Sequence, residues 1–296
     1  MDWRGPSEDT PLIAGEASDF REAQRHPPSR LGSRRQWTMA ETRTFVANAP
    51  VWVDLSTTDA AAARDYYAKL FGWKVDLTKD PDAGGYALAT VGNKNVAGIG
   101  PTQNPQAPSA WMLYIGTRDA DAVAKKVQAE GGKVIAPPFD VLKSGRMAVF
   151  QDPAGAFISV WQPKDMQGAD MMYAPSSFAW AELNARGFEK DKPFYKKIFG
   201  WGEKQSPMGE GQGDYTEFKL NDESIAGAME MNPMVPKEVP SYWLVYFGVE
   251  DVDKAHKKAV ELGGREMLEP QEFPGGRFSI LSDPQGAAFG LLKMQR

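Results

Sequence analysis

Apolar residues along the chain follow two spacings, one typical of strands and one typical of helices. A short extended run covers residues 51–55, and apolar positions then recur at i, i+3, i+4, i+7 and i+8. These positions are Ala63, Tyr66, Tyr67, Leu70 and Phe71. The second spacing predicts an amphipathic helix, and Gly72 suits its C-terminal end because glycine readily takes the left-handed conformation there.

The segments that follow predict a repeating unit of one strand, one helix and three strands. Short strands are expected at 73–77, 86–91 and 96–99, and a new strand at 111–115 leads into a helix at 120–130 that ends at Gly131-Gly132. An extended run at 133–136 and strands at 146–151 and 156–162 complete the unit. The last two strands are joined by Asp-Pro-x-Gly, which places proline and glycine where a type I turn prefers them.

The second half of the chain repeats the first. Residues 65–73 match 193–201 at a separation of 128, and the Asp-Pro-x-Gly turn at 152–155 recurs at 283–286. Gly131-Gly132 recurs at 263–264. Many anchors in one order at nearly constant separation indicate an internal duplication. Pro193, in the second copy of the helix, suits the first turn, where a missing N–H does no harm.

The ends and the middle of the chain differ from the repeated halves. Residues 1–46 hold scattered charges and prolines without a steady period, which predicts a flexible N-terminal tail. Met39 begins a plausible second start, so we interpret the residues before it as the product of a misassigned start codon or as an added, non-native leader, with a partner-binding or targeting tail as the alternative. The expected boundaries are 47–164 for the first domain, 165–175 for a linker and 176–296 for the second domain.

Composition narrows the function. The 296-residue chain has a formal charge of −5, which argues against a nucleic acid or an anionic membrane as partner. It has no cysteine, which excludes a disulfide and a thiol nucleophile and fits a reducing compartment. No stretch approaches the ~20 apolar residues of a membrane span. We therefore expect a cytoplasmic protein, either a monomer with internal pseudo-dimer symmetry or a homodimer, whose partner is a small molecule.

The duplicated elements resemble the vicinal-oxygen-chelate superfamily, which includes glyoxalases, bleomycin-resistance proteins and extradiol dioxygenases. The resemblance covers about residues 47 to 296 and rests on the helix that closes on Tyr-x-x-x-Phe-Gly-Trp, the Gly-Gly helix end and the Asp-Pro-x-Gly hairpin. It implies an α+β fold with two tandem glyoxalase-like domains. Each domain would be a pair of βαβββ units that form a cupped mixed sheet, and each cup would hold an active site.

The resemblance also implies where metal ligands stand in metal-dependent members, usually as histidine or glutamate. The corresponding positions are Trp52, Gly98, Met112 and Ser159 in the first half and Trp180, Gly227, Leu244 and Gly290 in the second. None is a good ligand for a first-row metal. The two histidines are His26 in the tail and His256 on a predicted helix. We therefore expect neither a metal nor another cofactor.

Four residues stand out as candidates for chemistry. Trp52 and Trp180 would either wall the cup against a flat ligand or fill the core. Asp54 and Glu182 lie two residues further along, hence on the same strand face. If desolvated, they would have raised pKa values and would act as a base or bind a cation. Alternatively, they are solvated or paired with Arg146 and Arg277.

Met112, Tyr114, Leu244 and Tyr246 complete the predicted ligand-binding set, since each pair shares one strand face. Arg146 and Arg277 would neutralise the acids, hold an anionic group or lie on the surface. Our leading interpretation is metal-independent binding of a small, partly aromatic molecule, as in bleomycin-resistance proteins. The alternative is a glyoxalase-like enzyme, a lyase, isomerase or hydroxylase-related protein, that uses Asp54 and Glu182 or an atypical metal site.

Overall fold

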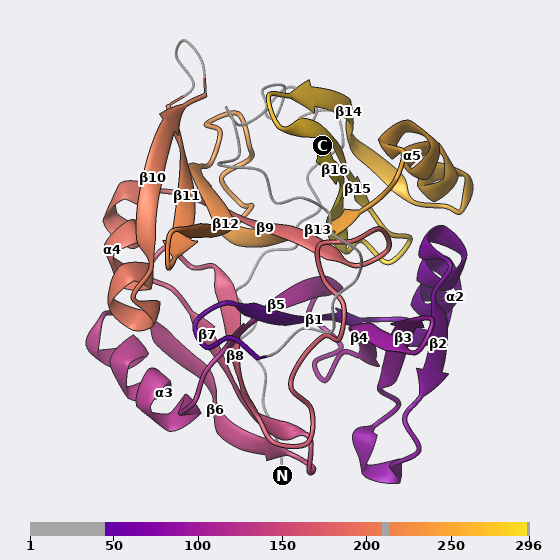
Figure 1. The fold of residues 1–296 in the computed structure, drawn as a ribbon, viewed down its shortest axis with the longest axis horizontal. Coiled ribbons are helices and arrows are strands. Elements are labelled where there is room, and N and C mark those ends of the chain that lie inside the picture. Colours follow the sequence, from indigo (N-terminus) through magenta and orange to yellow (C-terminus); the bar gives the residue numbers. More distant parts are fainter. Residues whose placement is uncertain (1–44, 209–212, 295–296) are drawn as a thin grey trace.

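Each half of the chain folds into its own eight-stranded sheet. The computed structural model describes residues 45–208 and 213–294. Residues 1–44 of the expected tail, which include His26, therefore lie outside the described residues. Figure 1 shows the two halves, with the first sheet in indigo to magenta and the second in orange to yellow. Every helix in the described ranges is too short or too polar to cross a membrane.

The first sheet has the strand order β2-β3-β4-β1-β5-β8-β7-β6. Its strands are β1 (Pro50–Thr57), β2 (Lys74–Leu77), β3 (Ala87–Val91), β4 (Lys94–Pro101), β5 (Ala110–Gly116), β6 (Lys133–Val141), β7 (Gly145–Gln151) and β8 (Phe157–Pro163). Its helices are α2 (Ala60–Phe71) and α3 (Ala120–Ala129), with a short 3₁₀ turn, η1 (Pro81–Ala83). The first and last strands of each unit pair in parallel, β1 with β4 and β5 with β8.

The second sheet repeats this topology in the order β10-β11-β12-β9-β13-β16-β15-β14. Its strands are β9 (Phe178–Ala185), β10 (Gly202–Pro207), β11 (Asp214–Leu220), β12 (Glu223–Glu230), β13 (Tyr242–Gly248), β14 (Arg265–Phe273), β15 (Gly276–Ser282) and β16 (Ala288–Met294). Its helices are α4 (Phe188–Phe199) and α5 (Val252–Glu261). The predicted α+β fold of two tandem domains with βαβββ units is therefore confirmed, and neither sheet closes into a barrel.

Helix α2 forms as the apolar spacing predicts. Its buried residues are the five predicted ones, Ala63, Tyr66, Tyr67, Leu70 and Phe71. The Asp59 side chain accepts a hydrogen bond from the Ala62 amide at 3.0 Å and so satisfies one of the free N–H groups of the first turn. Gly72 has a φ of 72°, the left-handed conformation expected at the C-terminal end.

Two local expectations were wrong. Helix α4 begins at Phe188, so Pro193 lies inside the helix and not in its first turn. The Glu230 carboxylate, from β12, accepts hydrogen bonds from the Gly187 and Phe188 amides at 2.7 and 2.8 Å, and this distant cap starts the helix early. Strand β6 continues past the expected end at Ala136 through two prolines, which a strand at the sheet edge tolerates.

The motifs that mark the repeat meet at the interface between the domains. The Tyr67 hydroxyl of α2 donates to Asp283 Oδ2 of the second domain at 3.0 Å and accepts from Trp111 Nε1 at 2.9 Å. The matching Tyr195 donates to Asp152 of the first domain and accepts from Trp243 Nε1. Helix α2 lies beside α5 on one flank and α3 beside α4 on the other. Each domain thus supplies the hydrogen-bond partner of the other.

The Gly-Gly pairs serve the same interface. A Cβ atom on Gly132 would lie 2.8 Å from Cε2 of Phe194 in the other domain, and one on Gly264 would lie 2.4 Å from the Tyr66 hydroxyl. Only glycine at these two positions lets α4 lie this close to the end of α3, and α2 this close to the end of α5. One core of buried side chains consequently runs through both domains.

The segment 165–175, expected as a linker, packs against the first domain. The Ala169 amide donates to the Val51 carbonyl at 2.8 Å, and the Asp170 amide donates to the Asn95 carbonyl at 2.9 Å. Met171 and Met172 are buried in the shared core. The connection therefore adds to the contact between the halves.

One of the two cross-domain contacts holds a second acid. Asp191 on α4 is 1% exposed and lies beside Asp152, where the matching position on α2 is Ala63. The Ala154 amide donates to its Oδ1 at 3.3 Å. Burial, together with the charge of Asp152, raises the pKa of Asp191 to about 8. The folded protein therefore keeps a proton that the unfolded chain releases near pH 4.

We expect Asp191→Asn to reduce the pH dependence of stability. The contribution of Asp191 to the free energy of unfolding falls as pH rises from about 4 to about 8, because the unfolded state loses this proton first. Asparagine cannot titrate. The Tm of the variant minus the Tm of wild type should therefore be larger at pH 8.5 than at pH 5, as measured by calorimetry. Asp65→Asn, an exposed change on α2, is the control. Equal Tm differences at both pH values would contradict the assignment.

Candidate functional site

The strand register brings the predicted site residues of the first domain together. Asp54 pairs with Gly98 on one side and with Met112 on the other, and Trp52 pairs with Tyr114. Side chains alternate across a strand, so these residues share the face of the sheet opposite the domain interface. We call this face the first cup and the equivalent face, with Trp180, Glu182, Leu244 and Tyr246, the second cup.

A hydrogen-bonded cluster surrounds Asp54 in the first cup. The Tyr86 and Tyr114 hydroxyls both donate to Asp54 Oδ2, at 3.1 and 3.0 Å. The Trp52 Nε1 group donates to the Tyr86 hydroxyl at 3.1 Å. The tryptophan therefore orients the tyrosine, and the tyrosine orients the acid.

The second cup repeats the cluster with glutamate in place of aspartate. The Tyr246 hydroxyl donates to Glu182 Oε1 at 3.3 Å, and Tyr215 also hydrogen-bonds to this carboxylate. Trp180 Nε1 donates to the Tyr215 hydroxyl at 2.9 Å. The Asn184 side chain, from the same strand, adds a contact at 3.5 Å.

Tyr86 and Tyr215 were not among the residues predicted for the site. They are separated by 129 residues, as are Val96 and Ile225, which we had counted among the repeat anchors. The repetition of a tyrosine at this separation was the signal available in the sequence. The sequence alone did not show what this repetition meant. Tyr86 directly precedes β3, which is separated from β1 by β4, and its hydroxyl reaches Asp54 only in the folded sheet.

Burial dominates the electrostatics of both clusters. It raises the pKa of Asp54 to about 6 and that of Glu182 to about 7, and the hydrogen bonds from the tyrosines counteract part of this rise. Burial and the neighbouring carboxylates also hold the pKa values of Tyr86, Tyr114, Tyr215 and Tyr246 well above their usual range. The tyrosines therefore stay protonated donors while the acids titrate near neutral pH.

The positions of the family's metal ligands do not fit a metal. A Cβ atom on Gly98 would lie 1.8 Å from the Tyr86 hydroxyl, and one on Gly227 would lie 1.8 Å from the Tyr215 hydroxyl. A Cβ atom on Gly290 would lie 2.0 Å from Cδ1 of Tyr246. The tyrosines thus fill the space into which ligand side chains would extend.

The donor chemistry agrees with the geometry. Trp52, Met112 and Ser159 stand at the other three positions of the first cup, and none offers an imidazole or a carboxylate. In the ranges that the structure describes, no group of three or more His, Cys, Asp or Glu side chains is placed to hold a metal ion.

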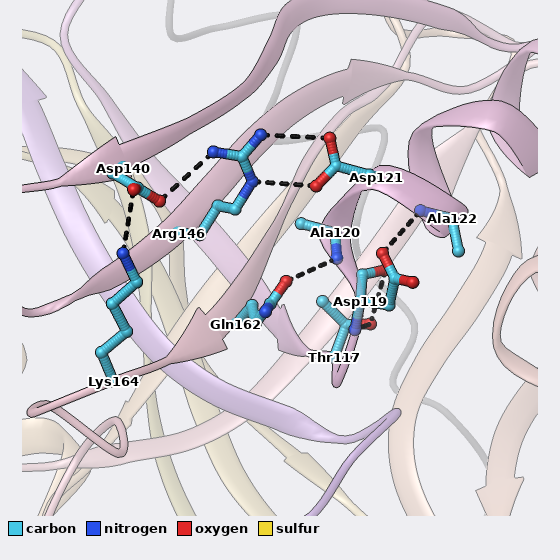
Figure 2. Close-up of polar contacts among 9 residues, drawn as sticks. All are labelled: Thr117, Asp119, Ala120, Asp121, Ala122, Asp140, Arg146, Gln162 and Lys164. Atoms are coloured by element: carbon cyan, nitrogen blue, oxygen red, sulfur yellow. Dashed lines mark hydrogen bonds and ion pairs between the residues drawn. The ribbon is translucent and has the colours of Figure 1, made fainter.

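Arg146 and Arg277 lie outside the cups. Figure 2 shows Arg146 between Asp121 of α3 and Asp140 of β6, with Nε 2.9 Å from Asp121 Oδ2 and Nη1 3.2 Å from Asp140 Oδ1. Arg277 pairs in the same way with Asp253 and Glu272. The interpretation in which these arginines neutralise Asp54 and Glu182 is therefore wrong. Arg146 pairs with Gln162 in the sheet, so it shares the face on which Gln162 contacts α3.

His256 lies on α5, as predicted. It is 7% exposed, and its Nε2 atom lies 2.9 Å from Glu266 Oε2 of β14. This contact joins α5 to β14 on the side of the sheet away from the second cup. It gives the histidine a structural role in packing the helix on the sheet.

Comparison with known proteins identifies the family. The model of the Glyoxalase/Bleomycin resistance protein/Dioxygenase superfamily matches residues 49–160 and again residues 177–291. The chain belongs to this superfamily, with one family unit in each domain. The resemblance noted in the sequence is thereby confirmed.

Relatives of known name cover nearly the whole repeat. The anthracycline biosynthesis protein DnrV of Streptomyces peucetius is 38% identical over 267 residues, 85% of this chain and 95% of its own. The candidate glyoxylase CFP32 of Mycobacterium bovis is 39% identical over 261 residues, 86% of this chain and 98% of its own.

A solved structure extends the likeness to metal-dependent members of the fold. The Mn(II)-bound glyoxalase from Novosphingobium aromaticivorans superimposes with a TM-score of 0.58 at 16% identity, over 84% of this chain and 83% of its own. At this identity the likeness concerns the fold.

The hydrogen bond from Tyr86 predicts a measurable effect on Asp54. Tyr86→Phe removes one of the two donors to the carboxylate, so the pKa of Asp54 should rise above its value of about 6. A ¹³C NMR titration of the side-chain carboxyl carbons, with Asp54 assigned through Asp54→Asn, measures the change.

The second cup provides the control for this experiment. The pKa of Glu182 should stay unchanged in Tyr86→Phe and rise in Tyr215→Phe, because Tyr86 hydrogen-bonds to Asp54 and Tyr215 hydrogen-bonds to Glu182. An unaltered Asp54 pKa in Tyr86→Phe would show that the hydrogen bond contributes nothing to the titration.

Proposed function

We propose that the protein binds a small, partly aromatic molecule in its cupped sheets without a metal. The observation that carries the proposal is the carboxylate cluster, in which an acid of near-neutral pKa is held by two tyrosines beside a tryptophan. Aromatic faces attract flat and cationic groups, and a desolvated carboxylate binds a cation more strongly than an exposed one.

The free oxygen of Asp54 supports a role in ligand binding. Both tyrosines donate to Oδ2, and Oδ1 accepts no hydrogen bond from the described residues. Asp54 is half-buried, so the carboxylate borders solvent on the cup side. An ammonium or hydroxyl group of a ligand would therefore find an acceptor already oriented by its neighbours.

The name of one relative supports a ligand class. DnrV is named as an anthracycline biosynthesis protein. Anthracyclines combine a planar, partly aromatic ring system with an amino sugar that is cationic at neutral pH. This combination matches a cup with aromatic walls and one acid.

The same cluster favours one second candidate, a glyoxalase-like or hydroxylase-related enzyme. A carboxylate with a pKa of about 6 or 7 is matched to general-base work near neutral pH. In that case a screen of anthracycline intermediates would reveal turnover, and Asp54→Asn combined with Glu182→Gln would abolish it. Turnover that survives both changes would rule out these acids as the base.

Titration with daunorubicin tests the binding proposal. The drug's fluorescence should change saturably, and Asp54→Asn should weaken binding about tenfold or more, because a hydrogen bond to a charged group contributes about 1.5–3 kcal/mol. Asp121→Asn removes the same charge outside the cup and should leave the affinity unchanged.

The pH dependence adds a second criterion. Affinity for daunorubicin should fall as pH is lowered through about 6, since protonation removes the charge of Asp54. The aglycone lacks the ammonium group and should show little dependence over the same range. Absence of saturable binding by either compound would count against the proposal.

A further inference from the structure

The two cups differ in access although their frameworks match. At seven matched positions of the cup face, the first-domain residue is half-buried and its second-domain counterpart is buried. The pairs are Asp54/Glu182, Ser56/Asn184, Tyr86/Tyr215, Leu88/Glu217, Met112/Leu244, Met147/Phe278 and Val149/Ile280. The difference runs in one direction at these seven positions, whereas Trp52/Trp180 and Tyr114/Tyr246 are buried in both cups, so the first cup is the more open of the two.

Larger side chains fill the second cup. Leu268, Phe273 and Phe278 belong to a buried cluster with Trp180 and Tyr246. The matching residues of the first domain are Ala136, Val141 and Met147, each smaller or more flexible than its counterpart. The second cup therefore holds its own hydrophobic core on the face where a ligand would lie.

A segment between β12 and β13, residues 231–241, covers this core, and we call it the strap. Met231, Val235 and Val239 are buried together and pack on Tyr242 and Met267, which also border the cluster in the second cup. Figure 1 shows the strap on the side of the second sheet away from the first domain.

Arg186 holds the strap in place. Its guanidinium donates to three backbone carbonyls of the strap, those of Val235 at 3.0 Å, Pro236 at 2.6 Å and Val239 at 3.3 Å. A planar guanidinium with five N–H donors suits such multiple carbonyl contacts.

Among the residues that the structure describes, the first domain has no matching side-chain contact. Thr58 stands where the second domain has Arg186, and its amide donates to Ser109 as the Arg186 amide donates to Ser241. Both domains thus share the hydrogen bond from the backbone amide to a serine. The first domain has the short side chain of Thr58 in place of the arginine that reaches the strap. At the edge of the first cup, Phe139 pairs with Met147 and is 42% exposed, where the second domain has Gln271.

We infer that the first cup is the ligand site and that the chain binds one ligand, while the second cup is a filled, strapped half that supports the fold. The inference rests on the proposed function and specifies its place. The ligand class is a flat aromatic compound with a cationic group, placed with the cation at Asp54 Oδ1 and the ring near Met112, Met147 and Phe139.

Calorimetric titration of the full chain with daunorubicin tests the inference. We expect one equivalent per chain, an affinity at least tenfold weaker in Asp54→Asn, and an affinity within twofold of wild type in Glu182→Gln. Glu182→Gln keeps the volume and the hydrogen-bonding capacity of the side chain, so it serves as the matched control in the second cup.

A pair of exchanges between the cups separates access from charge. Met147→Phe places in the first cup the residue that fills the second, and it should weaken binding at least tenfold while circular dichroism and Tm confirm the fold. The reverse exchange, Phe278→Met, should leave one equivalent and an unchanged affinity.

The outcomes distinguish the inference from the function on which it rests. Two equivalents per chain, or binding that Glu182→Gln weakens and Asp54→Asn does not, would overturn the inference and leave the proposed function standing. Binding that is unaffected by both Asp54→Asn and Met147→Phe would also overturn it. Failure of the wild-type protein to bind either daunorubicin or its aglycone would overturn the proposed function itself.

Discussion

Two cross-domain hydrogen bonds, from Tyr67 to Asp283 and from Tyr195 to Asp152, are the contacts on which the arrangement of the two sheets depends. Each tyrosine is buried in an aromatic cluster, and each acid sits at the turn that joins the last two strands of the other domain. A buried donor or acceptor without a partner costs about 1–3 kcal/mol. Separating the domains would therefore expose these groups to solvent or leave them buried without a hydrogen-bond partner. The consequence is a pair of sheets that share one core and whose cup faces point away from each other.

In this arrangement the domains are held together through the faces of the sheets opposite the cups. The core that joins the halves lies on the helix side, where Trp73, Trp111 and Phe247 meet. The side chains of the two cups therefore differ at matched positions while the domains share one interface core. Leu88 and Glu217, or Met147 and Phe278, occupy equivalent places without disturbing the register of either sheet.

The tyrosine–carboxylate cluster occupies the positions at which the resemblance to metal-dependent members implied metal ligands. Gly98 and Gly227 allow the tyrosine hydroxyls to lie close to the strand that would otherwise carry a ligand. A metal site would need several basic donors, whereas this cluster needs one acid and two hydroxyl donors. The result is a site in each cup with one carboxylate whose pKa is raised toward neutral pH.

The sequence by itself determined the duplication, the βαβββ order and the buried faces of the helices, because periodic spacing and repeated anchors are local properties of the chain. It also placed Trp52, Asp54, Trp180 and Glu182 on the cup faces through alternation along one strand. Only the tertiary structure decided which side chains meet them. The Tyr86 hydroxyl donates to Asp54 across neighbouring strands. Arg146 lies on the α3 side of the sheet because it pairs with Gln162. Arg186 donates to the strap about 50 residues further along the chain. These contacts depend on register and packing between distant segments, which single-strand periodicity does not encode.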